Sequence, residues 1–175
     1  MDKFKSIVEC SNPVGKKIEV NHLYNYACYR EGWRLETQEE DTPLFTFEWD
    51  YLNSPQIICN NQKVCAEILT QFPTQEELQQ LSLNEKIFDA DIVGEKLLLT
   101  PRQEGDKIIR FGKTTPLKIK KLVIDRKLSQ EQKQNLIFFR KLNGEIVFVS
   151  GLEHGENGKI SEKSKKIIKI WVEKI

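Results

Sequence analysis

The sequence has no long hydrophobic run, few histidines and no two adjacent glycines. None of its apolar stretches approaches the roughly 18 to 20 residues that a membrane-spanning helix requires, and the first segment, MDKFKSIVEC, is too polar for a signal peptide. We therefore expect a cytoplasmic protein without a membrane partner.

Cysteine and histidine are too sparse and too scattered for a zinc site. The spacing C-x-x-C does not occur, and the two histidines, His22 and His154, are isolated. Without signs of secretion, we expect reduced and mostly buried thiols rather than two disulfides. The four cysteines are Cys10, Cys28, Cys59 and Cys65.

The usual signatures of catalysis are missing as well. The sequence has no G-x-S-x-G elbow, no G-x-x-x-x-G-K-[ST] loop and no G-x-G-x-x-G turn. Asp89 and Asp91 are paired carboxylates, but two aspartates alone are more often turn or surface residues than metal ligands. We predict no catalytic residue, no metal site and no cofactor in this segment.

The charge is unevenly distributed along the chain. Residues 1 to 90 hold 8 Lys and Arg against 15 Asp and Glu, whereas residues 91 to 175 hold 19 against 11. This division suggests two modules, of which the second would meet an anionic partner such as nucleic acid. The other interpretation is a solvated surface with uneven lysines. We place the boundary after residue 85, with modules at 1–85 and 86–175.

The local patterns predict many short strands and a few short helices. Alternating segments such as FTFEWDY and IFFRKLNGEIVFV indicate strands, and KIFDADI is strand-like as well. Asn143-Gly144 is typical of a type I′ hairpin. Further turns are expected at Glu31-Gly32, Asn60-Asn61 and Gly105-Asp106. Helices are predicted to start at Thr74 and Ser129, each with a capping-box partner three residues on, and at Thr115 with Pro116 in the first turn. The predicted class is α+β, dominated by strands.

A dense cluster of cations lies in the second module. From residue 107 to 127 the single acid Asp125 faces eight basic residues, a pattern suited to phosphate contacts, and Phe111 is the only aromatic residue there. Sparse aromatics favour a folded or double-stranded nucleic acid recognised through its backbone over a single strand. The eight are Lys107, Arg110, Lys113, Lys118, Lys120, Lys121, Arg126 and Lys127.

The order of motifs in residues 86 to 172 resembles a known family. FDAD, PRQEGDKI, FG, LKIKKLVIDRKL, NGEIVFVSGL and KISEKSKKIIKI follow one another as in the C-terminal domain of tRNA(Ile)-lysidine synthetase, a MesJ-type cell-cycle protein. The first module resembles, more weakly, the segment that precedes this domain. The resemblance implies a β-sandwich-like domain with short flanking helices, similar to a domain of the phenylalanyl-tRNA synthetase β subunit, preceded by a smaller strand-rich module.

The resemblance also implies a function in tRNA modification. The family uses ATP, with Mg²⁺, to convert the wobble cytidine of an isoleucine tRNA to lysidine. Its catalytic domain opens with a Ser-Gly-Gly-x-Asp-Ser loop that is not in this sequence. The chain would therefore be an inactive C-terminal portion of a longer ligase, and would hold the tRNA body and acceptor stem through Arg102 and the eight cations.

Some positions depart from the family pattern. Thr100 replaces the first arginine of R-x-R. Ser129-Gln130 stands where the family tends toward Pro-Arg, and Lys133 and Ile137 stand where it later tends toward Arg and Pro. Arg102 itself could instead pair locally with Glu104 or Asp106. The alternative function is a protein-interaction or dimerisation module that pairs the acidic half of one copy with the basic half of another.

Overall fold

The computed structural model describes residues 14, 17–21, 24–37 and 45–175. The chain divides into two compact units, Met1–Asp41 and Thr42–Ile175. Each unit is described by itself. Among the described residues, no helix is long and apolar enough to cross a membrane.

The first unit contains a three-stranded antiparallel sheet. Its strands are β1 (Lys17–Asn21), β2 (Tyr24–Tyr29) and β3 (Gly32–Thr37), in that order. Tyr29 pairs with Gly32 across a tight turn, and Gly32 has a φ of 127°, which favours glycine. The predicted bend near Gly32 is thus confirmed.

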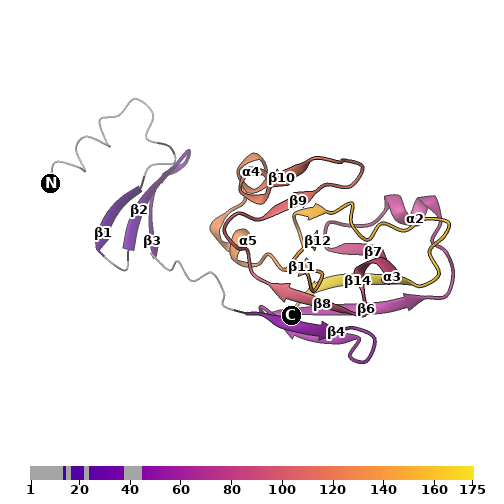
Figure 1. Cartoon of the computed structure of the whole chain (residues 1–175). Coiled ribbons are helices and arrows are strands. Elements are labelled where there is room, and N and C mark those ends of the chain that lie inside the picture. Colours follow the sequence, from indigo (N-terminus) through magenta and orange to yellow (C-terminus); the bar gives the residue numbers. More distant parts are fainter. Residues whose placement is uncertain (1–13, 15–16, 22–23, 38–44) are drawn as a thin grey trace. The chain divides into compact units, whose positions relative to one another are not determined.

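The second unit is built around two antiparallel sheets (Figure 1). A four-stranded sheet has the order β5-β6-β14-β7, and a five-stranded sheet the order β13-β12-β11-β8-β4. Most of these strands are rich in β-branched and aromatic residues, as half-buried strands require. The strands are β4 (Phe47–Asp50), β5 (Gln56–Cys59), β6 (Gln62–Leu69), β7 (Glu85–Asp89), β8 (Lys96–Thr100), β11 (Phe138–Arg140), β12 (Ile146–Val149), β13 (Glu153–His154) and β14 (Ile167–Lys174).

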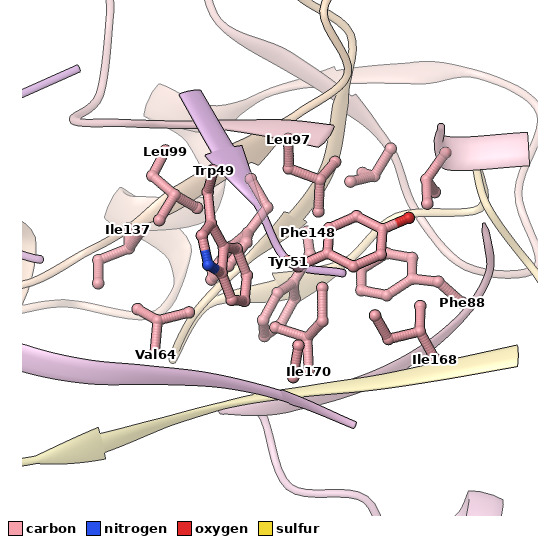
Figure 2. Packing of buried hydrophobic residues seen from close by; sticks show 14 of the residues in the cluster. Trp49, Tyr51, Val64, Phe88, Leu97, Leu99, Ile137, Phe148, Ile168 and Ile170 are labelled. Atoms are coloured by element: carbon pink, nitrogen blue, oxygen red, sulfur yellow. The ribbon is translucent and has the colours of Figure 1, made fainter. Parts of the chain in front are cut away.

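The larger hydrophobic cluster draws on both sheets (Figure 2). Val64 and Ile170 from the four-stranded sheet and Trp49, Leu97 and Phe148 from the five-stranded sheet are all fully or nearly fully buried. Burial of each such side chain stabilises the fold by about 1.5 to 3 kcal/mol relative to exposure. The strand-rich α+β class predicted from the sequence is confirmed.

A second hydrophobic cluster forms where a short hairpin and a helix meet the five-stranded sheet. The hairpin consists of β9 (Lys107–Ile109) and β10 (Pro116–Lys118), and α4 (Ile119–Asp125) follows it directly. Ile108, Ile119 and Leu122 pack with Phe138 and Val149 of β11 and β12. The cations of residues 107–127 therefore lie on or next to a hairpin and helix that this cluster packs against the five-stranded sheet.

The remaining helices are short: α2 (Gln75–Gln79), α3 (Ala90–Val93) and α5 (Gln130–Gln134). Both predicted capping boxes are present: the hydroxyls of Thr74 and Ser129 accept from the backbone N–H three residues on, and Glu77 and Gln132 bond back. Asp89 is both the last residue of β7 and the N-cap of α3, so the predicted strand over KIFDADI ends at Asp89.

The helix expected from Thr115 starts later than predicted. Residues Pro116–Lys118 form β10 and pair with β9, and Lys118 is the N-cap of α4. The pairing explains the shift, because Leu117 faces the second cluster from a strand as well as it would from a helix. The type I′ prediction for Asn143-Gly144 is also wrong, since Gly144 has a positive φ of 87° and Asn143 does not.

The division of the chain differs from the boundary between residues 85 and 86. β14 pairs with β6 on one side and with β7 on the other, so strands before residue 85 and after it belong to one sheet. Residues 45 to 90 hold 2 basic against 7 acidic residues and fold together with the basic segment. The charge contrast thus lies within the second unit, because strand pairing joins segments that are distant in sequence.

Candidate nucleic-acid interface

The β9–β10 hairpin leads directly into α4 (Figure 1), and these elements carry several lysines. Lys107 and Lys118 stand directly opposite each other across the hairpin. Lys120 and Lys121 follow in the first turn of α4, and all four side chains are exposed. Two strands and one helix thus concentrate four positive charges.

The apolar residues of α4 explain why its lysines face solvent. Ile119, Leu122 and Val123 are buried in the second cluster, with at most 4% of their surface exposed. With 3.6 residues per turn, the residues between them lie on the opposite side of the helix. Lys120 and Lys121 are therefore held outward by the packing of their neighbours.

Several of these cations occupy positions that are locally unfavourable. Lys107 and Lys118 repel each other as directly opposite like charges. Lys118 caps α4 without a side-chain hydrogen bond, and the first turn of α4 has no acid. Lys127 has a φ of 52°, a conformation that favours glycine after a helix. Such violations of local rules tend to collect at functional sites.

Six lysines of the predicted interface have no anionic partner in the described part of the chain. No ion pair joins them to any described acid. They are Lys107, Lys113, Lys118, Lys120, Lys121 and Lys127, all exposed.

Arg110 and Arg126 differ from the lysines because they share one carboxylate. The Oε2 atom of Glu153 accepts from Nε of Arg110 at 2.9 Å and from an Nη of Arg126 at 3.0 Å. The Glu153 side chain is only 10% exposed. The two arginines therefore join the end of α4 to β13 while part of each guanidinium group stays accessible.

Among the described residues, Arg102 forms no ion pair with Glu104 or Asp106, the local partners suggested by the sequence. Asp106 does not pair with Arg102; both of its oxygens accept from Arg140, at 2.9 and 2.8 Å. Nε of Arg140 donates to the Thr100 hydroxyl at 2.8 Å, and the Arg140 and Asp106 side chains are only 6% and 7% exposed. Thr100, where the family pattern has arginine, thus belongs to a buried polar network.

The turn before β9 forms as predicted. Gly105 has a φ of 84°, and Oδ2 of Asp106 accepts from the backbone N–H of Gln103 at 2.8 Å. The role of Asp106 as partner of Arg140 was not predicted. An arginine in a strand of otherwise apolar residues, FFR, was the signal that a buried acid had to be nearby.

A further group of side chains surrounds Phe111, and sequence reasoning did not find it. The ammonium nitrogens of Lys86 and Lys159 lie 5.6 and 5.1 Å from the centre of the Phe111 ring. Glu156 accepts from the Gly112 N–H at 2.7 Å and from Lys159 at 3.1 Å. We call these residues, Phe111, Lys86, Lys159 and Glu156, the Phe111 cluster. Glu156 and Lys159 are three residues apart, but Lys86 and Phe111 come from two other segments, and no sequence spacing connects the three segments.

Burial and hydrogen bonding lower the pKa values of groups in and beside the Phe111 cluster. Lys86 is almost fully buried and donates to the carbonyl oxygen of Gly155, and burial lowers its pKa to about 8. The Gly112 N–H holds the pKa of Glu156 below its usual range. Burial, with a contribution from Lys86, likewise lowers the pKa of His154.

The described residues contain no group of three or more His, Cys, Asp or Glu side chains arranged to hold a metal. Asp89 instead accepts from the Asp91 N–H and from the Ser164 hydroxyl. What the geometry offers is a positively charged surface and an exposed aromatic ring.

Sequence comparison identifies relatives, although no family model matches the chain. It is 29% identical to a tRNA(Ile)-lysidine synthase from Clostridium acetobutylicum over 97% of its own length and 37% of that protein. A tRNA(Ile)-lysidine synthase from Clostridium perfringens is 36% identical over 49% of this chain and 18% of the relative. The chain is homologous to tRNA(Ile)-lysidine synthases. It spans about a third of the Clostridium acetobutylicum relative and aligns with its C-terminal part.

A solved structure shows the same fold. The crystal structure of a TilS C-terminal domain superposes with a TM-score of 0.62 at 17% identity, and the match covers 75% of this chain and 98% of that one. The resemblance drawn from the motif order is thus confirmed. The expected similarity to a phenylalanyl-tRNA synthetase domain stays a prediction.

Proposed function

We propose that this chain is the tRNA-binding C-terminal portion of a tRNA(Ile)-lysidine synthase and that it holds the tRNA body and acceptor stem. The observation that carries the proposal is the group of six exposed lysines without described partners, four of which meet on the β9–β10 hairpin and α4. Lysines that repel one another in the free protein are neutralised by phosphates in a complex.

The chemistry of lysidine formation is assigned to another part of the enzyme. The names of the relatives indicate lysidine formation on an isoleucine tRNA. This sequence has no Ser-Gly-Gly-x-Asp-Ser loop, so we place ATP, Mg²⁺ and catalysis outside it. In this division of labour the chain contributes affinity and positioning in the cytoplasm, and it is inactive alone.

Arg102, Arg110 and Arg126 complete the proposed interface. Arg102 is half-buried next to the turn that precedes Lys107. Arg110 and Arg126 are oriented by Glu153, which leaves their remaining N–H groups for phosphate oxygens. The lysines supply charge, and the arginines supply directed donors.

The test is fluorescence anisotropy with the chain and two RNAs, an isoleucine tRNA and its acceptor-stem minihelix. We expect both to bind at about 50 mM salt and to lose affinity by orders of magnitude by about 200 mM, because each neutralised phosphate releases counterions. The double variant K120E/K121E should bind at least tenfold more weakly while unfolding at an unchanged temperature, since both side chains are exposed.

K163E/K165E is the matched control. It makes the same charge change at two exposed lysines outside residues 107–127 and should retain most of the affinity. Equal losses in both double variants would show that binding follows net charge only. Absence of RNA binding at low salt, together with a salt-sensitive dimer, would favour the interaction module.

A further inference from the structure

Phe111 is an exposed aromatic ring on a fixed backbone. Its surface is 56% exposed, yet its N–H donates to the carbonyl of His154 at 2.9 Å, and the neighbouring Gly112 is held by Glu156. The N–H of Glu156, two residues after β13, donates to the carbonyl of Ile109 at 2.8 Å. Two backbone hydrogen bonds, one on each side of Arg110, thus fix the segment that presents the ring to solvent.

Part of the ring stays accessible although two lysines lie over it. The ammonium nitrogens of Lys86 and Lys159 are over the ring, 5.6 and 5.1 Å from its centre. Lys86 is buried, whereas the long Lys159 side chain is 48% exposed and flexible, and 56% of the Phe111 surface is exposed. A flat molecule can therefore stack on the exposed part of the ring when Lys159 swings aside to reach its attached anionic group.

The charges around the ring favour an anionic partner. Lys86, Lys159, Arg110 and Arg126 are grouped with two acids, Glu153 and Glu156. Both acids are occupied, Glu153 by two arginines and Glu156 by Lys159 and the Gly112 N–H. The local excess is two positive charges next to an exposed aromatic surface.

We propose that Phe111 is a stacking site for one unpaired nucleobase of the bound RNA, with Lys159 near its phosphate and Lys86 supporting the ring from below. This inference rests on the proposed RNA-binding function and adds to it. The lysines of β9, β10 and α4 follow a duplex backbone, and Phe111 takes a nucleotide where the duplex ends. Arg110 connects the two areas, because it precedes Phe111 and shares Glu153 with Arg126.

The test uses the whole chain and two RNA hairpins that differ only in an unpaired 3′ extension of a few nucleotides. Stacking on an aromatic side chain is worth about tenfold in affinity for each base. We expect the wild type to prefer the extended hairpin by about that factor and F111L to lose the preference while binding the blunt hairpin normally. F111W should keep the preference, because a larger ring also stacks.

F72L is the matched control, since Phe72 is similarly exposed and no described cation lies over its ring. It should behave as the wild type. Equal binding of both hairpins by the wild type, or an intact preference in F111L, would overturn the stacking site while leaving the RNA-binding function in place. Failure of the wild type to bind either hairpin would overturn both.

Discussion

The cations of the second unit fall into two groups with different surroundings. Arg140 and Lys86 are buried, and Arg140 makes a two-point ion pair with Asp106. Lys107, Lys118 and Lys120 are exposed and have no described partner. The buried cations therefore hold parts of the fold together. The exposed cations make no described contact that would stabilise the fold.

The difference separates stability from binding. A buried charge requires a specific partner, because removal from water costs several kcal/mol. An exposed lysine costs little to keep, but repulsion from a neighbouring lysine is a small net cost. Where such costs accumulate, as on the β9–β10 hairpin and α4, a partner outside the fold is the simplest explanation.

The largest effect is expected when the buried ion pair is broken. R140M leaves the carboxylate of Asp106 without its partner in a site where only 7% of that side chain is exposed. We expect the free energy of unfolding, measured in urea, to fall by about 3 to 5 kcal/mol. K120M removes one positive charge from the exposed lysines and should change the free energy of unfolding by less than about 0.5 kcal/mol.

The double variant D106L/R140M distinguishes a lost pair from lost packing. Replacement of both partners by apolar residues should restore much of the stability, because no buried charge remains. If R140M destabilised the protein no more than K120M, the division into two groups of cations would not hold.

Local features of the second unit could be predicted, and long-range ones could not. The caps at Thr74 and Ser129 depend on residues three positions apart, and the Asn60-Asn61 hairpin turn on two adjacent residues, both with positive φ. Pairing of β14 with β6 joins segments about a hundred residues apart, and no spacing encodes it.

The candidate interface shows the same limit. The count of cations from residue 107 to 127 made the segment a candidate, but could not show which of these cations Glu153 would hold. The start of α4 was misplaced because Thr115-Pro116 satisfies the local rule for a helix start, while pairing with β9 makes Pro116–Lys118 a strand. Prediction failed where tertiary contacts overrode a local preference.

A smaller effect is expected from pH, through Lys86. Its pKa is lowered from 10.5 to about 8 by burial, so between these values the unfolded chain binds the proton more tightly than the folded one. Stability therefore rises as pH increases through this window. From pH 7 to 9 the contribution of Lys86 to the free energy of unfolding should grow by about 1.3 kcal/mol.

The measurement compares urea unfolding of the wild type and K86M at both pH values. Subtraction removes opposing contributions such as that of Cys59, whose pKa burial raises to about 12. Between pH 7 and 9 the free energy of unfolding should rise more in the wild type than in K86M. An equal pH dependence in the two proteins would mean that Lys86 is as easily protonated in the fold as in water.

The smallest change in stability is expected from K118S, which also separates the role of Lys118 in folding from its role in RNA binding most clearly. K118S places a hydroxyl at the N-cap of α4, which lacks a side-chain cap, and removes the repulsion with Lys107. We expect a gain of about 0.5 to 1 kcal/mol in the free energy of unfolding. The same change removes one phosphate contact, so RNA affinity should fall and the log–log salt slope should decrease by about one unit. A substitution that stabilises the protein and weakens its complex would show that Lys118 is kept for binding, whereas a loss of stability would place it with the cations that organise the fold.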